Sequence, residues 1–161
     1  MAKNLEEQSL IIVKPDAIQR SLLGAIISRL EQKGLKIIAL KMARLGDVTL
    51  DDHYAHHKDK AFFGSLKRFM QSAPVALIVV SGIKAVQAVR LIVGPTKGYE
   101  ADAGSIRGDF SLSGQTNIVH ASDSVETAVV EIRRFFTADE IHGYSKPDFL
   151  YLGSEDERGV D

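Results

Sequence analysis

His120 is the residue whose type and position most clearly favour chemistry. It lies in the segment Asn117-Ile-Val-His120-Ala-Ser122-Asp123-Ser124, where a short strand is expected to give way to a helix. The N-terminus of a helix attracts anions and phosphates through its free backbone N–H groups. A neutral imidazole carries a lone pair near pH 7 and can act as a nucleophile toward phosphorus. This segment therefore predicts a histidine that carries a phosphoryl group.

Glu131 is the predicted partner of this histidine. It lies between Ala128 and Phe135 at helical spacing, at the edge of an apolar helix face. A buried carboxylate without a partner is costly. If the helix packs back onto the strand, Glu131 can orient the His120 ring, and Ser122 can bridge the two. The alternative is a strand-end histidine that bonds to the backbone, with Glu131 in solvent, and spacing alone leaves both interpretations open.

Further polar side chains could bind an anionic substrate, namely Lys14, Tyr54, Arg90, Thr96, Arg107 and Asn117. Lys14 directly follows a predicted strand and can project into a site at the sheet edge. Arg107 lies beside Gly108, in a glycine-rich stretch where the backbone can approach an anion closely. Each basic residue, taken singly, also fits a solvated surface charge. Neither GxxxxGK[ST] nor GxGxxG occurs, so nucleotide binding would have to use a less common arrangement.

His53, His56 and His57 form a second group of histidines. His53 and His57 are four residues apart, so they could share a helix face and hold a divalent metal ion, as in a metal-dependent hydrolase. No carboxylate or second histidine pair completes a known ligand spacing. The other interpretation places His53 and Tyr54 on a helical surface that lines a cleft.

The composition limits the class of protein. The chain has 161 residues, 45% of them hydrophobic and 25% charged, which fits one domain with one core. A formal net charge of −1 argues against a protein that mainly coats nucleic acid or an anionic membrane. The absence of cysteine excludes disulfides, thiolate catalysis and cysteine-rich zinc sites. A charged N-terminal region and the lack of a long apolar run favour a cytoplasmic protein without a membrane span.

Hydrophobic patterns place these residues on elements. Strands are expected at 9–13, 36–43, 75–80 and 117–120, and helices at about 21–33, 49–57, 61–71 and 83–93. Pro15 is expected to stop the first strand. Asp123 is predicted to cap a last helix, with Glu126 completing a capping box. The stretch at 94–115 is expected to be a long irregular loop, a type that often carries function.

With the extra helices set aside, this order is βαββαβ, the ferredoxin-like split unit. It predicts an α+β fold with a four-stranded antiparallel sheet, extra helices, and helices on one face. We expect a single domain over residues 1–153 and a polar, mobile tail over residues 154–161. Many functions share this fold, so the fold alone does not identify one.

Five segments in the same order resemble the nucleoside diphosphate kinase family. They cover about residues 8–136 with the family's spacing, which makes the resemblance specific. The segments are Ile12-Val-Lys14-Pro-Asp16-Ala-Ile-Gln-Arg20, His53-Tyr54, Phe62-Phe63, Ser105-Ile-Arg107-Gly-Asp109-Phe110 and Asn117 to Ser124.

The resemblance implies a role for each matching residue. His120 is similar to the phosphorylated nucleophile, and Glu131 and Ser122 are similar to the pair that holds its ring. Lys14 and Asn117 resemble groups that bind the ribose 3′-hydroxyl. The other counterparts are the phosphate ligands Tyr54, Arg90, Thr96 and Arg107, the base-stacking Phe62, and Asp123, an acidic residue often linked to magnesium.

The implied reaction is ping-pong transfer of the γ-phosphoryl group of ATP or another nucleoside triphosphate to a nucleoside diphosphate, through a phosphohistidine at His120 and with Mg²⁺ as cofactor. Base contact by stacking alone implies tolerance of all bases and both sugars. The resemblance also implies a homo-hexamer or homo-tetramer, with no membrane and no obligatory nucleic acid as partner. The alternative is a non-catalytic module of the same fold that binds nucleotides or nucleic acid, which the intact His120 disfavours.

The chain departs from the family pattern mainly around the predicted base site. Lys97-Gly98 follow Thr96 where Asn or Asp and then Pro are usual. Gly114 stands where an apolar residue often forms the second wall of the base clamp, which argues against tight stacking. Ala121 replaces a usual glycine, and Thr116 replaces a frequent basic residue. None of these differences removes a predicted catalytic group.

Overall fold

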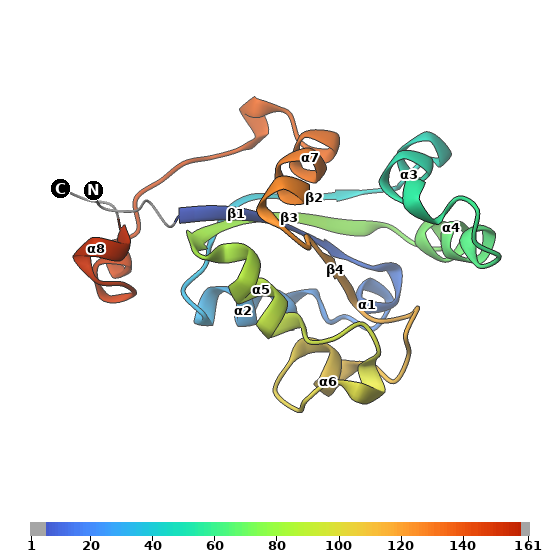
Figure 1. Ribbon diagram of the computed structural model, residues 1–161, viewed down its shortest axis with the longest axis horizontal. Helices are drawn as coiled ribbons and strands as arrows, with labels where there is room; N and C mark the ends of the chain where they lie inside the picture. The colour runs from blue at the N-terminus through green and yellow to red at the C-terminus, as the bar shows by residue number, and fades with distance from the viewer. Residues whose placement is uncertain (1–5, 159–161) are drawn as a thin grey trace.

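The computed structural model in Figure 1 describes residues 6–158 as one four-stranded sheet surrounded by helices. All neighbouring strands are antiparallel, and their order is β2-β3-β1-β4. The strands are β1 (Glu6–Val13), β2 (Lys36–Ala43), β3 (Val75–Ile83) and β4 (Val119–Ala121). This topology is the α+β, ferredoxin-like arrangement that the sequence predicts.

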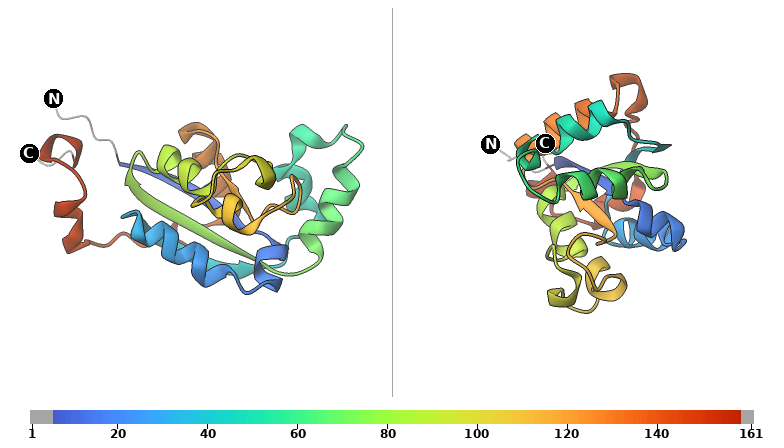
Figure 2. Two further views of the ribbon diagram at one scale, coloured as in Figure 1. Left: turned by 90° about the horizontal axis from the view of Figure 1, so that it is seen from below. Right: turned by 90° about the vertical axis from the view of Figure 1, so that its right-hand side faces the viewer.

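Helices cover both faces of the sheet. The two helices of the βαββαβ unit, α2 (Leu23–Gln32) and α5 (Ala85–Val93), pack on one face of the sheet. The left view of Figure 2, seen from below, shows this face. The opposite face is covered by α7 (Val125–Phe135), with α3 (Asp47–His53) and α4 (Phe63–Gln71) at one end. The remaining elements are α1 (Pro15–Gln19), α6 (Ile106–Phe110), α8 (Glu155–Arg158) and the 3₁₀ turns η1 (Ala55–His57), η2 (Gly98–Glu100), η3 (Ala138–Glu140) and η4 (Pro147–Tyr151).

The expectation of helices on one face only is therefore wrong, and β1 gives the reason. Its Leu10 and Ile12 join the core under α7, whereas Ile11 and Val13 join the core under α2 and α5, and all four are fully buried. A strand with a continuous apolar run needs cover on both sides.

β1 ends at Val13, directly before Lys14 and Pro15, as predicted, and Pro15 is in addition the first residue of α1, since its fixed φ and missing N–H suit a helix start. The predicted start of the last helix is wrong. The N-cap of α7 is Ser124 rather than Asp123, because Ser124 has extended backbone and its Oγ accepts from Thr127 N at 3.1 Å. The predicted capping box of Asp123 and Glu126 is therefore absent. Asp123 therefore lies outside α7, which begins at Val125.

The segments expected to be irregular contain short regular elements. η2 and α6 lie within residues 94–115. Residues 155–158 of the predicted tail form α8, and residues 159–161 lie outside the described residues.

Candidate active site

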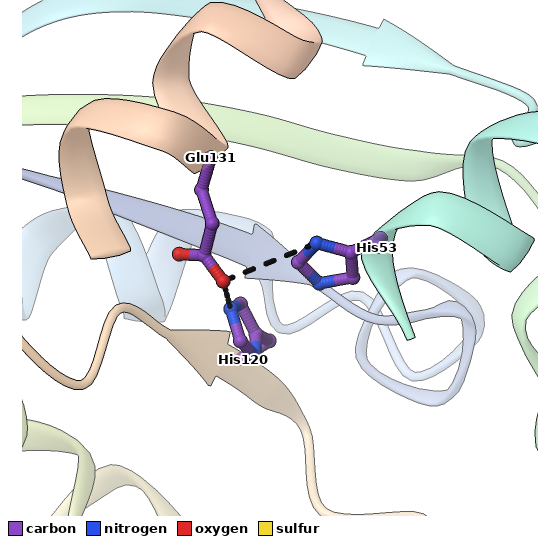
Figure 3. Close-up of side chains that lie close together, drawn as sticks. All are labelled: His53, His120 and Glu131. Carbon is purple, nitrogen blue, oxygen red and sulfur yellow. Dashed lines mark hydrogen bonds and ion pairs between the residues drawn. The ribbon is translucent and has the colours of Figure 1, made fainter. Parts of the chain in front are cut away.

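His120 is held from behind by a carboxylate and a serine. In β4 it pairs with Ile12 of β1, so its side chain faces the layer of α7 and α3. Its Nε2 lies 2.8 Å from Glu131 Oε1, and Ser122 Oγ donates to Glu131 Oε2 at 2.6 Å. Figure 3 shows Glu131 reaching down from α7 onto the ring. The structure thus brings together the three residues that the sequence linked, and the strand-end interpretation with Glu131 in solvent is wrong.

Ser122 is fixed because β4 continues alongside β1. Its N donates to Leu10 O at 3.1 Å, and Leu10 N donates to Ser122 Oγ at 3.2 Å. The hydroxyl therefore accepts from the central strand and donates to Glu131. Since Ser122 is fully buried, this contact has no competition from water.

Glu131 remains ionised despite its burial. Burial acts to raise its pKa, but the hydrogen bond and electrostatic interaction with His120, the hydrogen bond from Ser122 and the electrostatic interaction with His53 together lower the pKa below its ordinary value. An ionised carboxylate accepts the proton of His120 Nε2, which leaves the lone pair on Nδ1. Nδ1 is consequently the nitrogen available to a substrate.

A pocket of about 590 Å³ opens in front of His120. Its wall contains Glu131, Asp123 and all seven residues predicted to bind nucleotide, which are Lys14, Tyr54, Phe62, Arg90, Thr96, Arg107 and Asn117. The wall also contains His56 and His57, which the sequence marked only as part of a second histidine group, and Leu66, Gln115 and Thr127, to which the sequence did not point. Their only common signal is proximity along the chain to predicted residues.

Lys14 and Asn117 form one polar unit at the inner end of the pocket. Lys14 Nζ donates to Asn117 Oδ1 at 2.6 Å, and Asn117 Nδ2 donates to the carbonyls of Thr96 at 2.8 Å and Gly114 at 2.9 Å. Burial and the nearby Arg107 charge lower the pKa of Lys14 to about 8, although Asp16 acts to raise it. The ammonium therefore carries a partly uncompensated charge toward the pocket.

Arg107 braces the backbone that carries His120. Its Nε donates to Asn117 O at 3.1 Å, its Nη2 to Val119 O at 2.6 Å and its Nη1 to Gly94 O at 2.9 Å. Two of its five N–H groups remain for a ligand. Burial, followed by the nearby charge of Arg90, lowers its pKa to about 10, so it stays cationic near neutral pH.

Gly108 serves a different purpose from the expected one. A Cβ at this position would lie 1.9 Å from Asp102 O, so glycine lets α6 pack against the preceding turn. The close backbone approach is within the loop itself rather than toward an anion.

A strained turn precedes β4. Ile118 has φ of 75°, which is rare for a β-branched residue, and Val119 N donates to Asn117 O at 2.8 Å across it, as in a γ-turn. Asp16 Oδ2 accepts from Ile118 N at 3.0 Å, and Lys14 N donates to Ile118 O at 2.9 Å. These bonds hold the strained turn between Asn117 and His120.

Arg90 and Asp123 face each other on the pocket wall. Arg90 Nη1 lies 3.0 Å from Asp123 Oδ1, and the Asp123 side chain is 74% exposed. An exposed carboxylate in the wall of a pocket that also contains Lys14, Arg90 and Arg107 could hold Mg²⁺, which proteins commonly bind through one or two carboxylates together with substrate phosphates. Of the two wall carboxylates, Asp123, which pairs with Arg90 and is exposed, is the candidate for this, since Glu131 is buried and engaged by His120 and Ser122.

The metal hypothesis for His53 and His57 is wrong. α3 ends at His53 and His57 belongs to η1, so the two do not share a helix face. The described residues that come close enough to share an ion are instead His53, His120 and Glu131, with ligand atoms within 4.8 Å. Arg134 Nη1 lies 3.2 Å from His53 Nδ1, which puts a cation where a metal would bind. His53 is buried behind His120, and only Tyr54 of the predicted pair lines the pocket.

Comparisons with known proteins agree on one family. The family model described as nucleoside diphosphate kinase matches residues 7–141. A nucleoside diphosphate kinase from Parabacteroides distasonis is 47% identical over 94% of this chain and 99% of its own length. One from Staphylothermus marinus is 51% identical over 84% of this chain and 96% of its own length.

Solved structures agree with the sequences. A halophilic nucleoside diphosphate kinase from Halobacterium salinarum in complex with CDP has a TM-score of 0.90 and 36% identity, covering 92% of this chain and 99% of its own. A transition state mimic of the Borrelia burgdorferi enzyme with bound vanadate and ADP has a TM-score of 0.86 and 34% identity, with the same coverage. The sequence and the fold both agree with these relatives, and the chain belongs to the nucleoside diphosphate kinase family.

Proposed function

We propose that this chain transfers the γ-phosphoryl group of a nucleoside triphosphate to a nucleoside diphosphate through His120. The observation that carries the proposal is the 2.8 Å contact between His120 Nε2 and Glu131 Oε1, which leaves Nδ1 as the nucleophile beside the pocket. Phosphoryl transfer through a histidine needs three parts: the nucleophile, a carboxylate that orients its ring, and a pocket that binds the phosphates.

The reaction has two mirrored steps. In the first, the Nδ1 lone pair of His120 attacks the γ-phosphorus, an N–P bond forms, and the bond to the β,γ-bridging oxygen breaks with its electron pair on the departing diphosphate. In the second, a terminal oxygen of another diphosphate attacks the same phosphorus, and the N–P electron pair returns to Nδ1. Glu131 accepts the hydrogen bond of Nε2 throughout, so it stabilises the positive charge that develops on the ring in both directions.

Cationic side chains stabilise the phosphates during transfer. Arg90 and the two free N–H groups of Arg107 are the candidates for the equatorial oxygens, with Tyr54 and Thr96 as further phosphate ligands. Lys14 and Asn117, joined by their 2.6 Å bond, are the pair we assign to the ribose 3′-hydroxyl. When bound with the nucleotide, Mg²⁺ would neutralise phosphate charge, and Asp123 is the residue that would help to hold it.

Phe62 is the aromatic surface we assign to the base. It is 45% exposed and lines the pocket, where a base can stack on its face. Stacking does not depend on the pattern of hydrogen-bonding groups on the base. Broad tolerance of bases follows from that mode of contact, and tolerance of both sugars follows from the assigned contact to the 3′-hydroxyl, which ribose and deoxyribose share.

We further propose a homo-hexamer or homo-tetramer. β2 is an edge strand, and its Leu40 and Met42 are 50% and 58% exposed, so a second copy would cover apolar surface there. None of the helices within residues 6–158 combines the length and apolar character that crossing a membrane requires. The single domain over residues 1–153, the mobile tail over residues 154–161 and the cytoplasmic location stay predictions, which limited proteolysis and cell fractionation would check.

Phosphorylation by labelled ATP tests the reaction. The protein is incubated with γ-labelled ATP and Mg²⁺, and the protein-bound label is expected to be acid-labile, alkali-stable and removed by added diphosphate. The His120→Asn protein should take no label, whereas His56→Asn, at the pocket wall, should still be labelled. Intact protein that binds nucleotide without label would instead support the non-catalytic module.

A further inference from the structure

Arg134 lies next to the Glu131 carboxylate but does not pair with it. The two residues are three apart on α7, a spacing at which opposite charges are neighbours and can form an ion pair. Glu131 instead contacts His120 and accepts from Ser122, and Arg134 donates to Asp52 and to His53. Glu131 and Arg134 could therefore form an ion pair with each other along α7, but each of them contacts other residues instead.

His53 stands between the two charges. Its Nδ1 lies 3.2 Å from Arg134 Nη1 and 3.9 Å from Glu131 Oε1, so the guanidinium and carboxylate are no farther apart than these two distances together. The His53 ring also packs edge-on to the ring of His120, at 4.7 Å between centroids, and to Phe135 at 5.3 Å. In Figure 3 it fills the space beside the Glu131 carboxylate, reaching in from α3.

His53 acts as a neutral acceptor rather than as a second cation. Burial, followed by the proximity of His120, lowers its pKa to about 3, although Glu131 acts to raise it. The neutral ring presents the lone pair of Nδ1 to Arg134 and keeps its proton on Nε2. Asp52, next to His53 on α3, supplies the negative charge that Arg134 needs.

We infer that Asp52 and His53 are positioning residues for phosphoryl transfer, because they hold the Arg134 guanidinium away from Glu131. The inference rests on the proposed function of His120. If Arg134 reached Glu131, the planar fork of the guanidinium would bind the carboxylate with two hydrogen bonds and compete with the imidazole. His120 would lose both its orientation and the negative charge that stabilises its positively charged form.

A double-mutant cycle on His53 and Arg134 tests this. His53→Phe keeps a ring against His120 and Phe135 but removes the acceptor for Arg134. We expect the rate of His120 phosphorylation to fall about tenfold, with the half-saturating ATP concentration unchanged. In a protein that also carries Arg134→Leu, the same His53→Phe change should cost less than about twofold, because no guanidinium remains to capture Glu131.

Asp52→Asn supplies a second cycle that does not disturb the core, since the Asp52 side chain is 63% exposed. We expect Asp52→Asn to slow His120 phosphorylation about threefold, and we expect this slowing to disappear in the Arg134→Leu background. If His53→Phe does not fold, the Asp52 cycle tests the inference in its place. An equal slowing in both Arg134 backgrounds would show that His53 acts by packing alone, and no slowing would show that it does not act at all; either overturns the inference. If the unmutated protein takes no label, the proposed function fails instead.

Discussion

The inner end of the pocket and its outer rim are built in opposite ways. At the inner end, the polar side chains are buried and bonded to several strands and loops, among them Lys14, Arg107, Asn117, Ser122 and Glu131. At the rim, Phe62 is half exposed, and Gly114 contributes only backbone atoms to the pocket wall.

This difference reflects what each end must do. Phosphoryl transfer depends on placing a nucleophile and charges before the reaction begins, because reorganising them would add to the barrier. The nucleotide base takes no part in bond making, so a stacking surface is sufficient. Substitutions at the inner end should consequently affect the rate constant, the stability or the binding of the reacting part of the nucleotide, whereas those at the rim should affect only binding of the base.

Glu131→Gln should have the largest effect among substitutions that keep His120. The amide has the same shape but no charge, so it cannot stabilise the positively charged ring. We expect kcat to fall about a hundredfold with little change in KM. Steady-state assays would measure both constants, with Glu126→Gln as the matched control, an exposed glutamate on the same helix. A loss confined to KM would contradict the assigned role of Glu131.

Arg107→Met should weaken the fold as well as the reaction. It leaves the carbonyls of Gly94, Asn117 and Val119 without this donor, and the strained turn at Ile118 without its brace. We expect the free energy of unfolding to fall by about 2–3 kcal/mol. Urea unfolding at fixed protein concentration measures this, with the exposed Arg133→Met as control. An unchanged urea midpoint would mean that Arg107 serves substrate alone.

Local sequence patterns singled out the residues of the inner end as candidates, and the family resemblance chose between the interpretations that spacing left open. The second strand was predicted at its observed bounds, 36–43, because its apolar pattern and flanking residues agree. Helical spacing placed Glu131 at the edge of the apolar face of α7, and burial without solvent then required a partner such as His120.

The missing parts depend on contacts between distant segments. Periodicity does not reveal that Arg107 donates to three carbonyls, nor that Arg134 meets His53 across 81 positions. The strain at Ile118 has no sequence signal, because β-branched residues normally avoid positive φ. Pro15 was interpreted only as a strand breaker, although proline equally suits the first residue of a helix.

Lys14 should make nucleotide binding depend on pH. Its pKa of about 8 lies below the ordinary value of 10.5, so it is charged at pH 7 and loses its charge as the pH rises above 8. We expect KM for nucleoside triphosphates to rise about fivefold between pH 7 and pH 9.5. In Lys14→Met the KM at pH 7 should already be high, and the rise should disappear. A rise that persists in that variant would assign the titration to another group.

Gly114→Val should have the smallest effect, at the rim alone. A Cβ at position 114 would meet only Lys97 Cγ within 4 Å, at 3.6 Å, which is ordinary van der Waals contact, so the backbone has room for a Cβ there. It would add an apolar wall to the pocket that Phe62 also lines, and burying a base between two walls removes more apolar surface from water.

We expect KM for diphosphates to fall about threefold in Gly114→Val while kcat and the urea midpoint stay unchanged. Gly143→Val, at an exposed position outside the helices and strands that does not line the pocket and where a Cβ meets nothing within 4 Å, is the control. If Gly114→Val lowered kcat instead, the rim would be coupled to the position of His120, and the division between the two ends would not hold.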